Sequence, residues 1–286
     1  MFSAPTTKQY GSHMIMSNVQ KERKIKYINI DTKFRDEYNN KPTSDYNITL
    51  SERFTDVRNI TAVGAEIPHT FYNISENLQN NAIGFPSGKV LVVSDGQYNQ
   101  ASLITELNKQ SVALSMGATF DISYNRTTIT PSGSTTIRFD IDSSGNFAKY
   151  NFKSRLGWLL GFRGLNYTFS SKLTSEFLVD LSGPRYLYLV VDEFTGGGNQ
   201  SSFVSPLPTS VINKNILARI TIDNKNYGFM EIIPANERNG FLLSDTRSYT
   251  GKVDLHRLNV QLVNENGTVM NLNGADFSFC LRIEHE

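Results

Sequence analysis

Apolar and polar residues alternate with a period of two along most of the chain beyond residue 24. In "DYNITL" the side chains of Tyr46, Ile48 and Leu50 share one face of an extended segment. Near the end of the sequence, "DFSFCLRI" places Phe277 and Ile283 in one phase in the same way. Because successive side chains of a strand point to opposite faces, both segments are predicted to be half-buried β-strands.

The segment "RYLYLVV", residues 185–191, is apolar in both phases. A strand whose two faces are both covered has this composition, so we expect it in the middle of a packed sheet. Between residues 120 and 152, short strands are separated by the turn sequences "PSGS" and "SSGN", which predict a meander of antiparallel hairpins.

The phase of the alternation changes once near the end of the chain. Val253 and Leu255 share one phase and Leu258 has the other, so we expect a bulge near His256 and Arg257. The sequence "NENG", residues 264–267, then predicts a hairpin turn.

Only one helix is clearly indicated. In "GQYNQASLITELNKQ", Asn99 is a suitable N-cap, and Leu103, Ile104 and Leu107 form one apolar stripe. A second, short helical turn is expected in "KSRLGWLLGF", with Gly161 ending it.

Strands outnumber helices and do not alternate with them, so the sheets are predicted to be antiparallel and the chain all-β. The fold class that we expect is a single jelly-roll β-sandwich with an inserted helix and long loops. We expect a flexible N-terminal arm over residues 1–24 and a jelly-roll domain over residues 25–286, with an insertion near residues 195–209. Eight strands leave room for large insertions in a chain of 286 residues.

Composition narrows the classes of function. A net charge of +1 argues against broad electrostatic binding, so we predict no specific nucleic-acid partner. The single cysteine, Cys280, excludes an intrachain disulfide and is expected to be a buried free thiol. We expect neither a membrane span nor a secretory signal, because the sequence lacks the apolar runs that both require.

Candidate catalytic groups have simpler explanations. Glu66 and His69 flank Pro68, which ends a strand, so we interpret this segment as a strand exit with a rigid bend. The carboxylates of Asp140, Asp142, Asp192 and Glu193 are expected to be solvated strand ends rather than Ca²⁺ ligands. No nucleophile, base and orienting group can be named together, so we predict that the chain is not an enzyme and has no catalytic residues, metal site or cofactor.

Several segments carry a resemblance in the same order along the chain. An element that begins at Asp31 and ends at Arg35 precedes the strand "DYNITL". A second strand ends in the exit "IPHTFYN", and Gly96 and Tyr98 open the helix. "LGF" at residues 160–162 and "RYLYLVV" follow. This pattern resembles the single jelly-roll penton (vertex) capsid proteins of nucleocytoplasmic large DNA viruses.

The resemblance implies a structural viral capsid protein that forms homopentamers at the fivefold vertices of an icosahedral shell. It implies a place in the virion capsid after assembly in the host cytoplasm, with neighbouring major and minor capsid proteins as partners. Pro68, Phe71 and Tyr72 are then candidate interface residues, since exposed aromatic side chains suit an interface hot spot. The alternative for Phe71 and Tyr72 is that they cap the core of their own chain.

Two other functions stay open. Related minor capsid proteins, which lie beneath or between capsomers, share much of the pattern. Jelly rolls also serve as glycan-binding modules, for which Tyr150, Trp158, Tyr167 and Tyr249 are the aromatic candidates.

Overall fold

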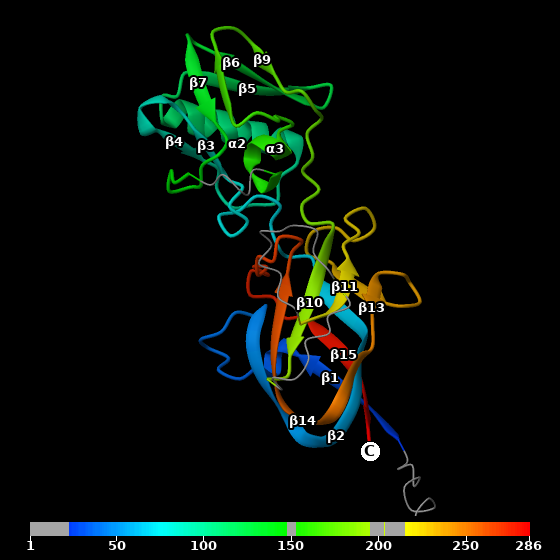
Figure 1. Ribbon diagram of the computed structural model, residues 1–286. Coiled ribbons are helices and arrows are strands. Elements are labelled where there is room, and N and C mark those ends of the chain that lie inside the picture. The colour runs from blue at the N-terminus through cyan, green and yellow to red at the C-terminus, as the bar shows by residue number, and fades with distance from the viewer. Residues whose placement is uncertain (1–22, 148–152, 195–202, 204–214) are drawn as a thin grey trace, which may run out of the picture.

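The computed structural model (Figure 1) separates into two bodies, one built of long strands and one of short strands with a helix. It describes residues 23–147, 153–194, 203 and 215–286. The described residues between 74 and 181 form the upper body in the figure, which we call the inserted lobe. The described residues before and after it form the lower body, the jelly roll. Each body has its own cluster of buried apolar side chains.

Six strands build the frame of the jelly roll. They are β1 (Lys24–Asp31), β2 (Asp45–Pro68), β10 (Tyr186–Asp192), β11 (Ile216–Thr221), β14 (Arg247–Val263) and β15 (Ser278–His285). Of these, β2 has 24 residues and β14 has 17, several times the usual strand length. Each of these two long strands supplies a segment to both sheets, so six strands provide the eight segments of a jelly roll.

Register defines the two sheets. In the first sheet the neighbouring strands are β1, β15, the second part of β2 and the first part of β14. Three antiparallel pairs show this order: Ile30 with Phe279, Leu281 with Ala62, and Arg247 with Ile60. The second runs the first part of β2, the second part of β14, β10 and β11, with the pairs Ile48 with Leu258, Leu262 with Leu189, and Leu187 with Ile220. If the eight segments are numbered in chain order, with β2 and β14 counted as two segments each, the first sheet has the order 1-8-3-6 and the second has the order 2-7-4-5. This is the jelly-roll arrangement of two Greek keys.

Irregular backbone lets the long strands pass from one sheet to the other. In β2 the residue Asp56 has a positive φ of 53°. In β14 the register shifts between Val253 and Leu255 and again between Leu255 and Arg257. The bulge that the change of phase predicted near Arg257 is confirmed. The predicted "NENG" turn is also confirmed, because the Asn264 amide bonds to the Thr268 carbonyl and closes the hairpin.

The strand β10 lies between β14 and β11, as its composition predicted. Leu187, Leu189 and Val191 point into the main core. On its other face, Tyr188 and Val190 belong to a second, smaller cluster. Phe203, a described residue of the expected insertion, packs on that cluster, so both faces of β10 are covered.

Two short strands extend the sheets. β12 (Ile232–Asn236) pairs with residues 64–68 of β2, and β13 (Leu242–Ser244) pairs with β11. A 3₁₀ helix, η3 (Thr32–Phe34), begins the loop between β1 and β2.

The inserted lobe enters the chain between β2 and β10. One of its sheets has the order β4 (Val90–Val92), β3 (Ala82–Gly84), β7 (Thr135–Arg138) and β8 (Asn166–Phe169). The other has the order β5 (Ala118–Ser123), β6 (Arg126–Pro131) and β9 (Leu173–Thr174). The helices are α2 (Gln100–Ala113), the short α3 (Leu156–Leu159) and the 3₁₀ helix η4 (Pro86–Gly88).

Both helix predictions are confirmed. Asn99 caps α2 through a capping box with Ser102, and Leu103 and Leu107 are buried. The helix contacts β5 of one small sheet and β4 of the other. After α3, Gly161 has a φ of +92°, the left-handed conformation that ends a helix.

The structure agrees with the predicted fold class, an all-β jelly-roll sandwich with an inserted helix. We expected large insertions but did not place this lobe within residues 74–181. Residues 1–22 of the arm predicted over residues 1–24, and nearly all of the insertion near residues 195–209, lie outside the described residues, so the domain limits stay a prediction. Lys24, the last residue of the predicted arm, is the first residue of β1. Among the described residues no helix combines the length and apolar character needed to cross a bilayer.

Candidate assembly surfaces

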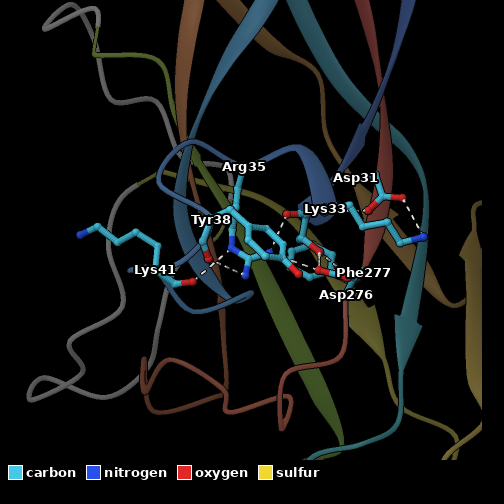
Figure 2. A network of polar contacts seen from close by, with 8 residues as sticks. Asp31, Lys33, Arg35, Tyr38, Lys41, Asp276 and Phe277 are labelled. Atoms are coloured by element: carbon cyan, nitrogen blue, oxygen red, sulfur yellow. Dashed lines mark hydrogen bonds and ion pairs between the residues drawn. The ribbon is translucent and has the colours of Figure 1, made fainter.

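Arg35 braces the loop between β1 and β2 from inside (Figure 2). Its Nη1 donates to the Thr32 carbonyl at 2.8 Å and lies 3.3 Å from the Asp276 carboxylate. Its Nε donates to the Lys41 carbonyl at 3.1 Å, and its Nη2 donates to the Tyr38 carbonyl at 3.2 Å. The guanidinium side chain is only 8% exposed, so one arginine satisfies carbonyls on both sides of the loop.

A second set of bonds fastens the start of this loop to the two residues just before β15. The Thr32 hydroxyl donates to Asp276 at 2.7 Å and accepts from the Phe277 amide at 3.0 Å. Asp31 caps η3 by accepting from the Lys33 amide at 2.9 Å. The acidic and arginine element of the resemblance is therefore an internal brace of the jelly roll.

Two aromatic side chains of this braced loop face solvent. Phe34 is 76% exposed, and Tyr38 is 57% exposed with its ring beneath the Arg35 guanidinium at 4.4 Å. We call Phe34 and Tyr38 the loop patch. A rigid backbone that presents exposed aromatic side chains loses little entropy when it binds another protein.

The exit from β2 lies against the start of β12. Pro68 is the last residue of β2 and pairs with Ile232. Beyond it, the His69 amide donates to the Glu231 carbonyl at 2.8 Å, and the Met230 amide donates to the His69 carbonyl at 2.9 Å. The predicted strand exit at Pro68 is confirmed.

Behind this exit, His69 and Phe71 are buried. Phe71 is 2% exposed and belongs to the main core, so its ring caps the core of its own chain. His69 is 3% exposed, packs against Phe71 with ring centroids 4.8 Å apart, and has Nδ1 3.1 Å from the Tyr227 carbonyl. A buried ring that contacts a backbone carbonyl gives His69 a structural role in its own chain.

Tyr72 is half-buried and stacks on Phe229 with ring centroids 5.8 Å apart. The assignment of Pro68, Phe71 and Tyr72 to an interface stays a prediction.

The exposed apolar surface at this exit comes mainly from the segment before β12. Phe229 is 37% exposed, Met230 71% and Ile232 60%. We call Tyr72, Phe229, Met230 and Ile232 the exit patch. Its sequence signal is the run "GFMEII", residues 228–233, which the alternation pattern alone did not distinguish from an ordinary strand.

Met230 has two unfavourable properties at once. Its φ is 74°, in the left-handed region that costs a bulky side chain about 1 kcal/mol or more. Its apolar side chain is also largely exposed to water. The hydrogen bond from the Met230 amide to His69 holds the backbone here, but it does not require an apolar side chain, whereas a binding surface would use one.

Two of the acidic strand ends differ from expectation. Glu193 and Asp140 are buried rather than solvated, at 8% and 1% exposed. Asp140 accepts both hydrogen bonds of the Arg138 guanidinium, at 3.0 and 3.1 Å. Asp142 accepts the amides of Ser144 and Asn146 in a tight turn. The pattern located these carboxylates at strand ends but could not show which had an arginine partner.

Glu193 belongs to a clamp centred on Arg247. The Arg247 Nη1 donates to the Glu193 carboxylate and, at 2.8 Å, to the Val191 carbonyl. Its Nη2 donates to the Asn215 carbonyl at 2.9 Å. The hydroxyl of Tyr249 also donates to Glu193, at 2.5 Å. Arg247 therefore joins the end of β10 to the start of β11, on either side of residues 194–214.

The remaining candidates for chemistry have separate surroundings. The Glu66 carboxylate is exposed and accepts from Ser278, whereas His69 contacts Tyr227, so these two side chains bond to different groups. Cys280 is half-buried rather than buried, and burial raises the pKa of its thiol. Among the described residues no group of three His, Cys, Asp or Glu side chains could hold a metal ion.

The aromatic candidates for glycan binding fall into three classes. Tyr167 and Tyr249 donate their hydroxyls to Glu176 and Glu193 of their own chain. Trp158 is half-buried, with the Arg163 guanidinium 3.8 Å from its ring centroid. Tyr150 lies outside the described residues.

Comparisons with known proteins return structural matches only. No family profile and no curated protein matches the sequence. The chain is similar to the mavirus penton protein, solved by crystallography, with 11% identity and a TM-score of 0.39 over 92% of this chain and 100% of that one. It is also similar to a chain of the Sputnik virophage solved by cryo-EM, with 12% identity and a TM-score of 0.42 over 91% and 98%. These identities and TM-scores are too low for either likeness to carry an argument about function.

Proposed function

We propose that the chain is a structural capsid protein that assembles into homopentamers at the fivefold vertices of an icosahedral virion. The proposal includes a role without catalysis, a place in the virion capsid, and contacts with neighbouring capsid proteins. Two features support it: the jelly-roll order of the eight strand segments, and the sequence pattern shared with vertex capsid proteins.

The observation that carries the proposal is the pair of exposed apolar patches on the jelly roll. A closed ring of identical subunits needs a heterologous interface, in which one surface of each copy packs on a different surface of the next. The loop patch follows β1, whereas the exit patch combines Tyr72, just after β2, with residues at and just before the start of β12. In Figure 1 the loop between β1 and β2 projects on the left of the jelly roll, and β13, the strand after β12, lies on its right.

A matched pair of variants tests the exit patch. Met230 and Tyr124 are both exposed, at 71% and 95%, and both have positive φ, at 74° and 51°. Asparagine tolerates that conformation, so Met230→Asn and Tyr124→Asn should each keep or raise the stability of the monomer. We expect Met230→Asn to abolish pentamers in native mass spectrometry, while Tyr124→Asn, on the inserted lobe, assembles like the parent.

Mixing two variants tests whether the interface is heterologous. Phe34→Asn removes the more exposed ring of the loop patch and leaves the exit patch intact. Met230→Asn removes the most exposed side chain of the exit patch and leaves the loop patch intact. Each variant alone should be monomeric, but their mixture should form heterodimers that cannot close into a ring. Pentamers of either variant alone, or a parent protein that is monomeric at every concentration, would contradict the proposal.

A minor capsid protein remains the second candidate, since the same patches could pack on a different capsid protein. Native mass spectrometry of the purified protein and cryo-EM density of intact virions distinguish the two roles. A fivefold assembly of this chain alone supports the vertex role, and a complex with another capsid protein at a different position supports the minor role.

A further inference from the structure

A cavity of about 360 Å³ lies at the junction of the two bodies. The inserted lobe lines it with Trp158, Leu159 and Asp180, and the jelly roll lines it with Tyr186 and Glu265. The volume falls within the range of about 300 to 1,000 Å³ that is typical of small-molecule sites. Its wall combines apolar rings with several polar groups, as ligand pockets usually do.

Glu265 lines this cavity and carries an unsatisfied polar atom. It occupies the "NENG" turn, whose backbone is fixed by bonds from the Asn266 and Thr268 amides to the Asn264 side chain. The Glu265 Oε2 is buried and makes no hydrogen bond to any described residue. Leaving a buried carboxylate oxygen unpaired is costly, so a ligand hydroxyl that meets this oxygen when the Glu265 side chain turns toward the cavity would be bound favourably. Burial also raises the pKa of this carboxyl group.

The charges around the cavity balance. Asp180 and Arg185 pair with each other, with Nη2 and Oδ2 2.9 Å apart. That leaves one cation, Lys153, and one acidic group, Glu265, in the lining. A cavity without net charge favours a neutral ligand over an anion or a cation.

Two side-chain amides in the lining, Asn73 of the jelly roll and Asn80 of the lobe, are already occupied. Asn73 donates to two backbone carbonyls, and Asn80 donates to the Asn73 carbonyl and accepts from the Ser75 amide. They fix the shape of the wall, while Glu265 offers an acceptor and Trp158 an indole surface. Hydroxyl donors attached to a compact, partly apolar ring match this combination.

We propose that the cavity binds a neutral sugar, with Trp158 forming an apolar wall and Glu265 accepting from a sugar hydroxyl. The site involves neither the loop patch nor the exit patch, so it is independent of pentamer formation and can be tested on monomeric protein.

Trp158 is the single tryptophan of the sequence, so its fluorescence reports on the cavity directly. The experiment titrates the parent protein with glucose, galactose, mannose and N-acetylglucosamine, and with N-acetylneuraminic acid as an anionic comparison. At least one neutral sugar should shift the emission saturably and protect Trp158 from acrylamide quenching. The proposal is wrong if none of the four does so, or if the acid binds more tightly than all of them.

Variants then assign the effect to the site. Glu265→Met should weaken binding at least about tenfold, because it removes the charged acceptor at nearly constant size. Glu237→Met is the control, since Glu237 is exposed and lies outside the cavity lining. Binding by Glu265→Met within twofold of the parent would overturn the assignment. If that variant does not fold, Asn266→Tyr, which fills the cavity from the same turn, should abolish the fluorescence response.

Discussion

The jelly roll and the inserted lobe are both antiparallel β-structures, but they are assembled from different distances along the chain. In the jelly roll, Ile30 of β1 pairs with Phe279 of β15, near the opposite end of the sequence. In the lobe, β5 pairs with β6 through a turn at Tyr124 and Asn125, and α2 packs on the strands next to it in sequence. The lobe therefore depends on local contacts, whereas the jelly roll needs both ends of the chain.

The two bodies meet where the chain leaves the jelly roll and returns to it. The Asn73 side chain donates to the carbonyls of Tyr98 and Leu181, each at 2.8 Å, and accepts from the Tyr98 amide at 2.8 Å. Gly183 lies beside Asn73, where an added Cβ would be 3.4 Å from the Asn73 Cβ. Because the entry and the return are adjacent, the lobe can be gained without disturbing the strand order of the jelly roll.

The largest expected effect concerns the clamp in the jelly roll. Arg247→Met leaves the Glu193 carboxylate buried without its cation, which should lower the free energy of unfolding by about 3 to 5 kcal/mol. Urea denaturation followed by circular dichroism measures the loss. Arg185→Met is the matched control, because its ion pair with Asp180 is exposed and should contribute less than about 1 kcal/mol. Equal losses in the free energy of unfolding for both variants would show that the buried clamp stabilises the jelly roll no more than an exposed ion pair does.

A glycine substitution tests the lobe alone. An added Cβ at Gly157 would lie 2.2 Å from Cγ of buried Phe139, so Gly157→Ala should destabilise the lobe by about 1 to 3 kcal/mol. Gly133, also in the lobe, has open space around it and serves as the control. Hydrogen exchange should show faster opening at residues 74–181 and unchanged protection in β14 and β15. Loss of protection in both bodies together would mean that they unfold as one unit.

The same contrast explains which parts of the fold the sequence could predict. The capped helix at Asn99, the turn at Gly267 and the bulge near Arg257 depend on neighbouring residues, and all three are confirmed. The division of β2 between two sheets depends on partners in β14 and β15 that are more than 180 residues away, and alternation cannot name a partner. For this reason the sequence indicated a sandwich but not the limits of the lobe.

The candidate surfaces were harder to predict than the fold. The exit at Pro68 follows from the chemistry of proline, but the burial of Phe71 depends on the main core closing over it. The positive φ of Met230 and the pairing of Glu193 with Arg247 arise from tertiary structure, so no local motif indicates them.

An intermediate effect is expected where the two bodies join. Asn73→Ala removes three hydrogen bonds at the junction and should cost about 1 to 2 kcal/mol. Asn108→Ala is the control, because Asn108 makes two such bonds within the lobe, both to Phe120. We expect Asn73→Ala to separate the thermal unfolding of the two bodies into two calorimetric transitions. A single transition for Asn73→Ala, shifted no more than that of Asn108→Ala, would contradict a role for Asn73 in coupling.

The smallest expected effect compares one tyrosine from each body. Tyr46 of the jelly roll is 1% exposed and its hydroxyl has no hydrogen-bond partner among the described residues. Tyr167 of the lobe donates to Glu176 at 2.6 Å and accepts from the Gly164 amide at 2.6 Å. Tyr46→Phe should therefore raise the free energy of unfolding by up to about 1 kcal/mol, and Tyr167→Phe should lower it by a similar amount.

The pH dependence of the Tyr46 variant provides a second measurement of the same hydroxyl. Burial, reinforced by the Asp31 carboxylate, raises the pKa of Tyr46. The hydroxyl ionises near pH 10 in the unfolded chain and at higher pH in the folded chain. Its contribution to the free energy of unfolding of the parent is therefore constant below about pH 10 and falls as the pH rises further. Tyr46→Phe removes this contribution, and its advantage over the parent in urea denaturation should grow between neutral pH and pH 11. An advantage that stays constant over that interval would show that the hydroxyl ionises as readily in the folded jelly roll as in the unfolded chain.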